Sequence, residues 1–395
     1  MKTPRTIAFL GIGLILALGP AGKAAPGQAP RTPGQAATQV IRCPEGTGTL
    51  AQRWEWARQT VRRQSPAAGY WVGYSIEKLM EENTYIGCFI GDGPKEVSLG
   101  ELLDGGKTFY PSHRGNMSFF SGRGFFDRRA DSDRMVKLVK KRIGVLYRFA
   151  KGAEGVLESV GAVDDHLPIA FEGKPLLWLG PATETESLKL LESLYDRPAT
   201  GKLAGRIVET AGIHEESAPV VPFLERVIKS RAAEPVRVEA VSALSGYGDA
   251  RITGILAPLA KSDASLEVRK EAIDVLGDIG KPEAIDVLIE IARTNGPEEV
   301  RKEAVQALGE NPSEKTIAAL ERIIVNDTVP DVQEEAVDAL AGIESGAGLP
   351  VLIRTAKTHP VIQIRKAAVE ALGESSDQRA LAALIELAKN KGTGL

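Results

Sequence analysis

The second half of the chain carries a hydrophobic pattern that repeats every 32 residues. The sequence VRKEAI at Val268–Ile273 has in-register counterparts that begin at Val236, Val300, Val332 and Ile364. A second column with the same period holds six leucines: Leu224, Leu256, Leu288, Leu320, Leu352 and Leu384. A fixed period of this length is typical of proteins built from stacked structural repeats.

Each repeat contains two helical patterns. After Val268, apolar residues recur at i, i+4 and i+8, and a second apolar stripe follows Pro282, a residue that suits the first position of a helix. The first helices are predicted to end at the glycines that follow their stripes: Gly277, Gly309 and Gly373. A lone helix pair cannot bury its own stripe, so the pairs must stack. The pattern therefore predicts an α-solenoid of six 32-residue helix pairs over residues 201–395.

The repeat sequence resembles a known family. The runs VRKEAIDVLG from Val268 and PEAIDVL from Pro282 are similar to the short HEAT repeats named after the phycobilisome lyases. The resemblance implies a curved stack in which the second helices line the concave side. Residues 40–200 look like the front domain of some exported bacterial HEAT-repeat proteins, a resemblance that implies no function.

Residues 40–200 follow a different pattern, and all four tryptophans lie there. A helix is predicted over Leu50–Arg63, and aromatic and β-branched runs predict strands over Tyr70–Ile76 and Tyr85–Ile90. Ile143–Phe149 and Gly155–Val163 read as a strand pair. Two further helices are predicted, one after the capping box of Ser98 and Glu101 and one over Ser187–Tyr195. We interpret this region as a smaller α+β front domain.

The first residues have the features of a signal peptide. Lys2 and Arg5 precede an apolar run over Ile7–Leu18, which is shorter than the about 20 residues that a membrane-spanning helix needs. Gly22 and Ala24 suit cleavage after residue 24. Residues 25–39, rich in Pro, Gly, Ala and Gln, are predicted to be a flexible tether. The mature chain is therefore expected to be exported, periplasmic or secreted, with no membrane span.

The chain has two cysteines, Cys43 and Cys88. In an oxidising compartment an even number of cysteines favours a disulfide, so we expect Cys43 to pair with Cys88. Two separate buried thiols are the alternative.

Composition and motifs argue against several functions. The net charge of −3 provides no basic field for nucleic acid. Some HEAT-repeat enzymes, notably deoxyhypusine hydroxylase, bind two irons through His-Glu pairs, but the matching positions here hold Lys270-Glu271 and Lys302-Glu303. Asp164-Asp165-His166 is a possible metal cluster or an ordinary charged loop. We expect no catalytic residues, no cofactor and no metal.

A column of arginines also follows the repeat. It consists of Arg237, Arg269, Arg301 and Arg365, beside Glu239, Glu271 and Glu303. The column is either a charged ladder for an acidic partner or a set of Arg–carboxylate pairs that tie neighbouring repeats together; the second interpretation is favoured because the repeat pattern itself accounts for it.

The outward positions of the second helices vary from repeat to repeat, which is expected of a binding surface. The residues predicted to contact a protein partner are Arg226, Asp286, Glu290, Glu321, Arg322, Arg354, Lys357 and Glu386. A merely solvated face is the alternative. A second predicted contact surface is the outer face of the last helix, Leu381–Lys389, including Ile385. The chain is thus predicted to be an exported protein-binding scaffold or adaptor.

The alternative function is a lyase-like or small-ligand-binding activity. Its site would lie in the solenoid groove or among the aromatic residues of the front domain: Trp71, Tyr74, Tyr110 and Phe119–Phe126. Such aromatic residues more often belong to a core than to a binding site.

Overall fold

The structure is a computed structural model. It describes residues 38–64, 66, 69–82, 84–87, 97–108, 119–120, 137–152, 155–197, 201–215, 217–248, 251–294 and 296–390. Residues Ala37–Leu395 belong to one compact unit. The predicted signal peptide and most of the predicted tether lie outside the described residues. Within the described ranges, no helix combines the length and apolarity that crossing a membrane requires.

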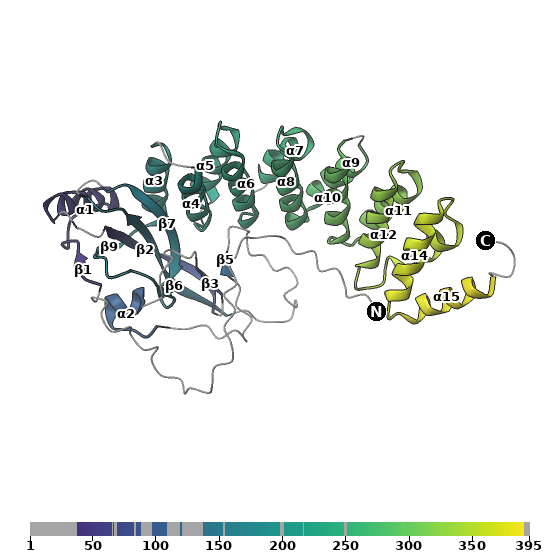
Figure 1. The fold of residues 1–395 in the computed structure, drawn as a ribbon, viewed down its shortest axis with the longest axis horizontal. Coiled ribbons are helices and arrows are strands. Elements are labelled where there is room, and N and C mark those ends of the chain that lie inside the picture. Colours follow the sequence, from purple (N-terminus) through teal and green to yellow (C-terminus); the bar gives the residue numbers. More distant parts are fainter. Residues whose placement is uncertain are drawn as a thin grey trace. The chain divides into compact units, whose positions relative to one another are not determined.

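The front domain is built on a five-stranded sheet with the order β1-β9-β2-β6-β7 (Figure 1). β9 pairs in parallel with both β1 and β2, whereas β2, β6 and β7 pair antiparallel. These strands are Val40–Arg42 (β1), Tyr70–Glu81 (β2), Leu138–Phe149 (β6), Leu157–Asp164 (β7) and Leu176–Pro181 (β9). Two small strand pairs accompany the sheet: Tyr85–Ile86 (β3) with Phe119–Phe120 (β5), and Val97–Ser98 (β4) with Pro168–Ile169 (β8). The predicted α+β class and the β6–β7 pair are confirmed.

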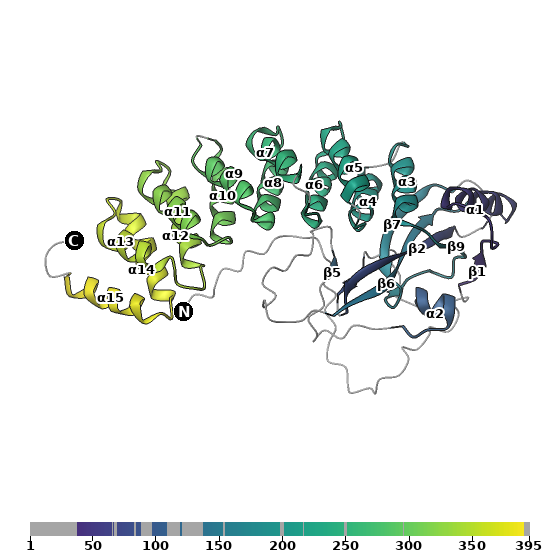
Figure 2. The same ribbon diagram turned by 180° about the vertical axis from the view of Figure 1, so that it is seen from behind.

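Helices cover both faces of this sheet. Leu50–Gln64 (α1) and Glu184–Tyr195 (α3) lie on one side, and Leu99–Asp104 (α2) lies on the other (Figures 1 and 2). Because side chains alternate along a strand, Tyr74 of β2 points into the core under α1 and α3 while Trp71 points into the core under α2. Both side chains are fully buried.

Six helix pairs follow the front domain, as predicted. In both views the first helices form one row and the second helices of the first five pairs form another, whereas the last helix lies apart from that second row (Figures 1 and 2). The first helices are Gly201–Gly212 (α4), Glu234–Ser242 (α6), Leu266–Ile279 (α8), Glu298–Gly309 (α10), Pro330–Ala341 (α12) and Ile362–Glu374 (α14). The second helices are Ser217–Lys229 (α5), Arg251–Ser262 (α7), Pro282–Ala292 (α9), Glu314–Asn326 (α11), Leu349–Thr358 (α13) and Gln378–Asn390 (α15). A 3-10 turn, Ala243–Gly246, extends α6.

The predicted stripes form the core of the stack. Val268, Ala272, Leu276 and Leu288 are all fully buried, and each buried leucine stabilises the fold by about 1.5–3 kcal/mol. One continuous cluster of buried residues extends from Leu50 in α1 into α15. The core under α1 and α3 is therefore continuous with the core of the solenoid, whereas the core under α2 is a separate cluster.

The prediction that glycines end the first helices holds for Gly309, the last residue of α10, and is wrong for Gly277 and Gly373. Gly277 lies inside α8, which continues to Ile279, and Gly373 lies inside α14. A Cβ atom at Gly277 would lie 3.1 Å from Ala307 Cβ, and one at Gly309 would lie 2.8 Å from Ala339 Cβ. These glycines are therefore needed for the close approach of first helices in neighbouring repeats.

The expected disulfide finds no support. Cys43 is a free, half-buried thiol directly after β1, and Cys88 lies outside the described residues.

Candidate protein-interaction surfaces

Ion pairs cross from repeat to repeat along the second helices. They involve seven of the eight predicted partner-binding residues: Arg226 with Asp196, Lys261 with Glu290, Lys315 with Asp286, Arg354 with Glu321, and Lys357 with Glu386. Arg322, the eighth residue, is exposed on α11. Pairs as exposed as these contribute only about 0–1 kcal/mol each. The side chains are thus loosely held, and their role in partner binding stays a prediction, as does the position of the second helices on the concave side.

The arginine column has the structural role that the sequence analysis favoured. Arg237 Nε donates to the carbonyl oxygen of Ile228 at 2.9 Å, and its guanidinium also pairs with Asp263 beyond α7. Arg301 likewise pairs with Asp327 and is only 6% exposed. The carboxylates are aspartates at the ends of second helices, so these two arginines tie neighbouring repeats together. Each arginine caps one second helix while holding the next.

The first helices α12 and α14 carry like charges beside one another. Glu334 and Asp338 are four residues apart on α12, and Glu370 and Glu374 are four residues apart on α14. We call these four residues and Glu335 the acidic face. Partial desolvation, and then the negative charges of the four glutamates, raise the pKa of Asp338. Lys302 reaches the edge of this face, with its Nζ 3.5 Å from Glu335. The sequence analysis missed the acidic face, although the i, i+4 acid pairs could have indicated it.

A chain of buried hydrogen bonds joins the front domain to the first helix pair. Tyr147 Oη lies 3.1 Å from Tyr74 Oη, which lies 2.7 Å from Ser187 Oγ, and Ser187 Oγ lies 2.8 Å from His214 Nε2. His214 Nδ1 donates to the carbonyl oxygen of Ala211 at 2.9 Å, so a neutral imidazole accepts at Nε2. Burial lowers the pKa of His214 to about 4 and raises the pKa of Tyr74 to about 12.

This Ser187–His214 pair is a structural contact. Ser187 is 0% exposed and His214 is 1% exposed, so a substrate cannot reach either side chain. A nucleophile and its base must meet the reacting atom directly. The pair therefore fastens α3 to the turn after α4.

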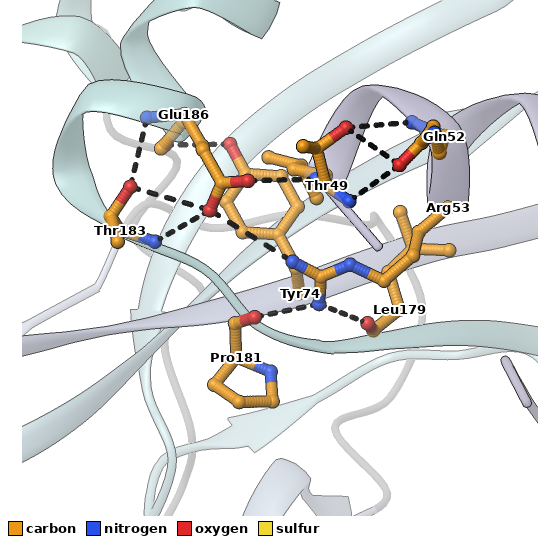
Figure 3. A network of polar contacts seen from close by, with 10 residues as sticks. Thr49, Gln52, Arg53, Tyr74, Leu179, Pro181, Thr183 and Glu186 are labelled. Atoms are coloured by element: carbon orange, nitrogen blue, oxygen red, sulfur yellow. Dashed lines mark hydrogen bonds and ion pairs between the residues drawn. The ribbon is translucent and has the colours of Figure 1, made fainter. Parts of the chain in front are cut away.

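A second polar network holds α1, α3 and β9 together (Figure 3). Glu186 completes a capping box with Thr183 at the start of α3, and its carboxylate also accepts from the backbone N–H of Leu50, 2.9 Å away. That backbone bond is the main cause of the lowered pKa of Glu186. Arg53 donates to the carbonyl oxygens of Leu179 and Pro181, each at 2.6 Å. The network fixes how the helices dock on the sheet.

The cluster Asp164-Asp165-His166 has its three ligand atoms within 4.8 Å of one another. Cations already balance both carboxylates: Lys141 Nζ lies 3.5 Å from Asp164, and Arg142 Nε lies 2.9 Å from Asp165. The side chain of His166 is 62% exposed. The geometry fits the charged-loop interpretation, since a divalent cation would have to displace these two positive charges.

The aromatic residues proposed as an alternative site divide into two groups. Trp71 and Tyr74 are buried core residues. Tyr110 and residues 121–126 lie outside the described residues, and the structure gives only the backbone of Phe119 and Phe120. The residues that can be placed therefore do not form a binding site.

A groove of about 630 Å³ lies between α4 and α6. It is hollow because Gly205 has no side chain, and a Cβ atom there would meet nothing within 4 Å. Lys202, Arg206 and Glu209 line the groove together with the apolar Val236. An apolar floor with charged residues around it is the usual composition of a small-molecule site.

Comparison with known proteins supports the repeat architecture. Residues 221–309, 254–341 and 317–393 match the family model for HEAT repeats, so this part of the chain is a HEAT-repeat solenoid. No match was found among curated protein sequences.

Several solved structures are similar at low identity. Human deoxyhypusine hydroxylase is 21% identical over 48% of this chain and 84% of that one, with a TM-score of 0.23. The complex of CpcE and CpcF of phycocyanin lyase from Nostoc sp. PCC7120 is 18% identical over 39% and 98%, with a TM-score of 0.32. YibA of Escherichia coli is 20% identical over 49% and 70%, with a TM-score of 0.31. This likeness concerns the helix-pair architecture and carries no function.

Proposed function

We propose that the chain is an exported scaffold that binds a basic segment of a partner protein on the acidic face of α12 and α14. The gathering of Glu334, Glu335 and Asp338 of α12 with Glu370 and Glu374 of α14 is the observation that carries this proposal, and the four glutamates contribute to the raised pKa of Asp338. HEAT solenoids typically bind other proteins, and this surface offers a positively charged partner a cluster of five acidic side chains.

The acidic face is costly to the fold. Like charges at i, i+4 destabilise a helix by roughly 0.2–0.5 kcal/mol per pair, and α12 carries two such acidic pairs and α14 one. The buried apolar stripes hold the stack without these charges. Groups kept in an unfavourable electrostatic environment are candidates for function, because a binding partner can neutralise them.

The predicted second-helix residues form the competing partner surface. Opposite charges already meet there, so this face presents little net field, and its pairs have a structural explanation. Exchanging the members of one pair, as in the double variant Glu321→Arg with Arg354→Glu, keeps the ion pair but inverts the charge that a partner meets. That variant is a matched control for the acidic face.

The test is capture of partners by the mature full-length chain from its native exported fraction, after mild cross-linking. Wild type is compared with the triple variant Glu334→Gln, Asp338→Asn, Glu370→Gln and with the Glu321/Arg354 exchange. The proposal predicts a protein captured by wild type and by the exchange variant but lost with the triple variant. Loss of the partner with the exchange variant alone would place the binding site on the second helices. Equal capture by all three chains would exclude both surfaces as the binding site.

Export is part of the proposal and rests on the signal-like residues 1–24. The mature chain is expected to begin at Ala25 and to be recovered from the periplasm or the medium. Intact-mass measurement of the native protein checks this, and a chain that keeps residues 1–24 in the cytoplasm would contradict it.

The groove between α4 and α6 supports a second candidate function, binding of a small molecule. Gly205→Leu would place an apolar side chain in the groove, at a position where an added Cβ atom meets nothing within 4 Å. If Gly205→Leu abolishes the chain's activity and the triple variant of the acidic face keeps it, small-molecule binding in the groove is favoured. If the triple variant abolishes the activity and Gly205→Leu keeps it, the scaffold is favoured.

A further inference from the structure

We propose that two copies of this chain pair through the outer face of α14 and α15, with the two α14 helices antiparallel. Four positions on this face, Val369, Leu381, Gly373 and Lys366, lack the neighbour that their counterparts have in earlier repeats. They define the shape and charge of a surface that would fit this face.

The first observation is an exposed apolar surface. Val369 is 39% exposed, whereas its counterparts Val337, Val305 and Ile273 are each 0% exposed because the next repeat covers them. On α15, Leu381 is 59% exposed and its counterpart Leu349 only 4%. The face has the composition of a repeat-to-repeat interface, and burying it would be favourable.

The second observation is an unfilled close-approach glycine. At Gly277 and Gly309, an alanine from the next first helix lies within about 3 Å of where a Cβ atom would be. Gly373 has the same place in α14, but a Cβ atom there would meet nothing within 4 Å. The hollow at Gly373 is therefore available to a side chain from another helix.

The third observation concerns charge. Lys302 on α10 reaches forward to Glu335 on the next first helix. Lys366 has the same place on α14 and is exposed, with Glu370 one turn further along the helix. A helix that covers α14 is expected to bring a carboxylate to Lys366 and a cation to Glu370.

A second copy of α14 meets all three requirements. Ile362, Lys366, Val369 and Gly373 are spaced by four, three and four residues, so they form one stripe, and Ile362 is 59% exposed. An antiparallel pairing centred between Ala367 and Ala368 places Ile362 against Gly373 of the second copy. It also places Lys366 beside Val369 and next to Glu370 of the second copy. The contact is self-complementary, as a two-fold dimer interface must be.

The test is the mass of the full mature chain in solution, measured by sedimentation equilibrium over a concentration series. Wild type is expected to dimerise, and Val369→Lys is expected to raise the dimer dissociation constant by about tenfold or more, since it places a second ammonium group beside Lys366 of the other copy. Val325→Lys is the control, because Val325 is a 61% exposed residue of α11 outside this face. Circular dichroism checks that all variants remain folded.

A charge-exchange series tests the antiparallel geometry independently of apolar burial. Lys366→Glu and Glu370→Lys should each weaken the dimer by placing like charges opposite each other, and the double variant should recover most of the loss. A wild-type chain that stays monomeric at all concentrations would overturn the proposal and leave the face to another occupant. A dimer that Val369→Lys does not weaken would also overturn it, as would a Lys366→Glu, Glu370→Lys double variant whose loss of affinity is the sum of the two single losses. Partner capture is measured separately, so failure here leaves the scaffold proposal standing.

Discussion

Ser187 Oγ lies 2.8 Å from His214 Nε2, and this bond joins the last helix of the front domain to the first turn of the solenoid. His214 accepts it only while the imidazole is neutral, because Nδ1 already donates to Ala211. The junction between the two parts of the molecule is therefore sensitive to protonation of one histidine.

The first prediction concerns stability in acid. The folded-state pKa of His214, about 4, is below the unfolded value of about 6.5, so the unfolded chain binds the proton first. The contribution of the neutral His214 to the free energy of unfolding is fully present above pH 6.5 and is lost as pH falls towards 4. The loss amounts to about 3 kcal/mol in the free energy of unfolding. Urea unfolding at a series of pH values measures it.

A His214→Gln variant isolates this effect from the carboxylates that titrate in the same range. The variant should be less stable than wild type at pH 7, but its stability should fall less steeply between pH 6.5 and 4. Parallel curves for the two proteins would show that His214 is not responsible.

The second prediction concerns the glycines between first helices. Gly309→Ala should lower the free energy of unfolding by about 1–3 kcal/mol, because its Cβ atom would lie 2.8 Å from Ala339 Cβ. Gly254→Ala on α7 is the control: its Cβ atom has open space, so it should raise stability by about 1 kcal/mol through helix propensity. Thermal unfolding of both variants distinguishes close approach from propensity, and equal shifts would contradict the packing role.

The third prediction compares a buried with an exposed ion pair. Arg301→Gln leaves Asp327 without its buried cation and should cost about 3 kcal/mol. Lys357→Gln breaks the exposed pair with Glu386 and should change stability by at most about 1 kcal/mol. The denaturant midpoints of the two variants measure both losses of stability. Similar losses would mean that burial does not determine how much these ion pairs stabilise the fold.

The fourth prediction gives opposite signs for stability and binding. The raised pKa of Asp338 means that its ionised form is unfavourable in the fold, so stability falls as pH rises through that pKa. Asp338→Asn should therefore stabilise the chain by roughly 0.2–0.5 kcal/mol near neutral pH. The same variant should weaken partner binding. A variant that loses stability and keeps its partner would contradict this account of the acidic face.

The repeating part of the fold was predictable because its signals are local and recur. Six stripes in one register specify the helix pairs, and Pro282 does open α9. The front sheet was predicted only in part. β1 has three residues and pairs with β9 across more than a hundred positions, as Val40 does with Leu176. Nothing near either strand in the sequence indicates its partner.

The surface was predicted less well than the core. A glycine after an apolar stripe is compatible with a helix end or with close packing, and only the position of Ala307 decides for Gly277. The charged residues of the second helices were predicted one by one, although Lys357 and Glu386 are about one repeat apart and form an ion pair. Pairing across a solenoid depends on how neighbouring helices stack, which hydrophobic periodicity does not specify.

Site-specific photo-cross-linking tests the central claim most directly. A photoreactive residue replaces Gln306, which is exposed and has the place in α10 that Asp338 has in α12, and a second chain carries it at Val325 on the second helices. The account predicts a cross-link from position 306 to a lysine- or arginine-rich segment of a partner protein, and little or none from position 325. A cross-link from position 325 alone, or a partner segment without basic residues, would contradict it.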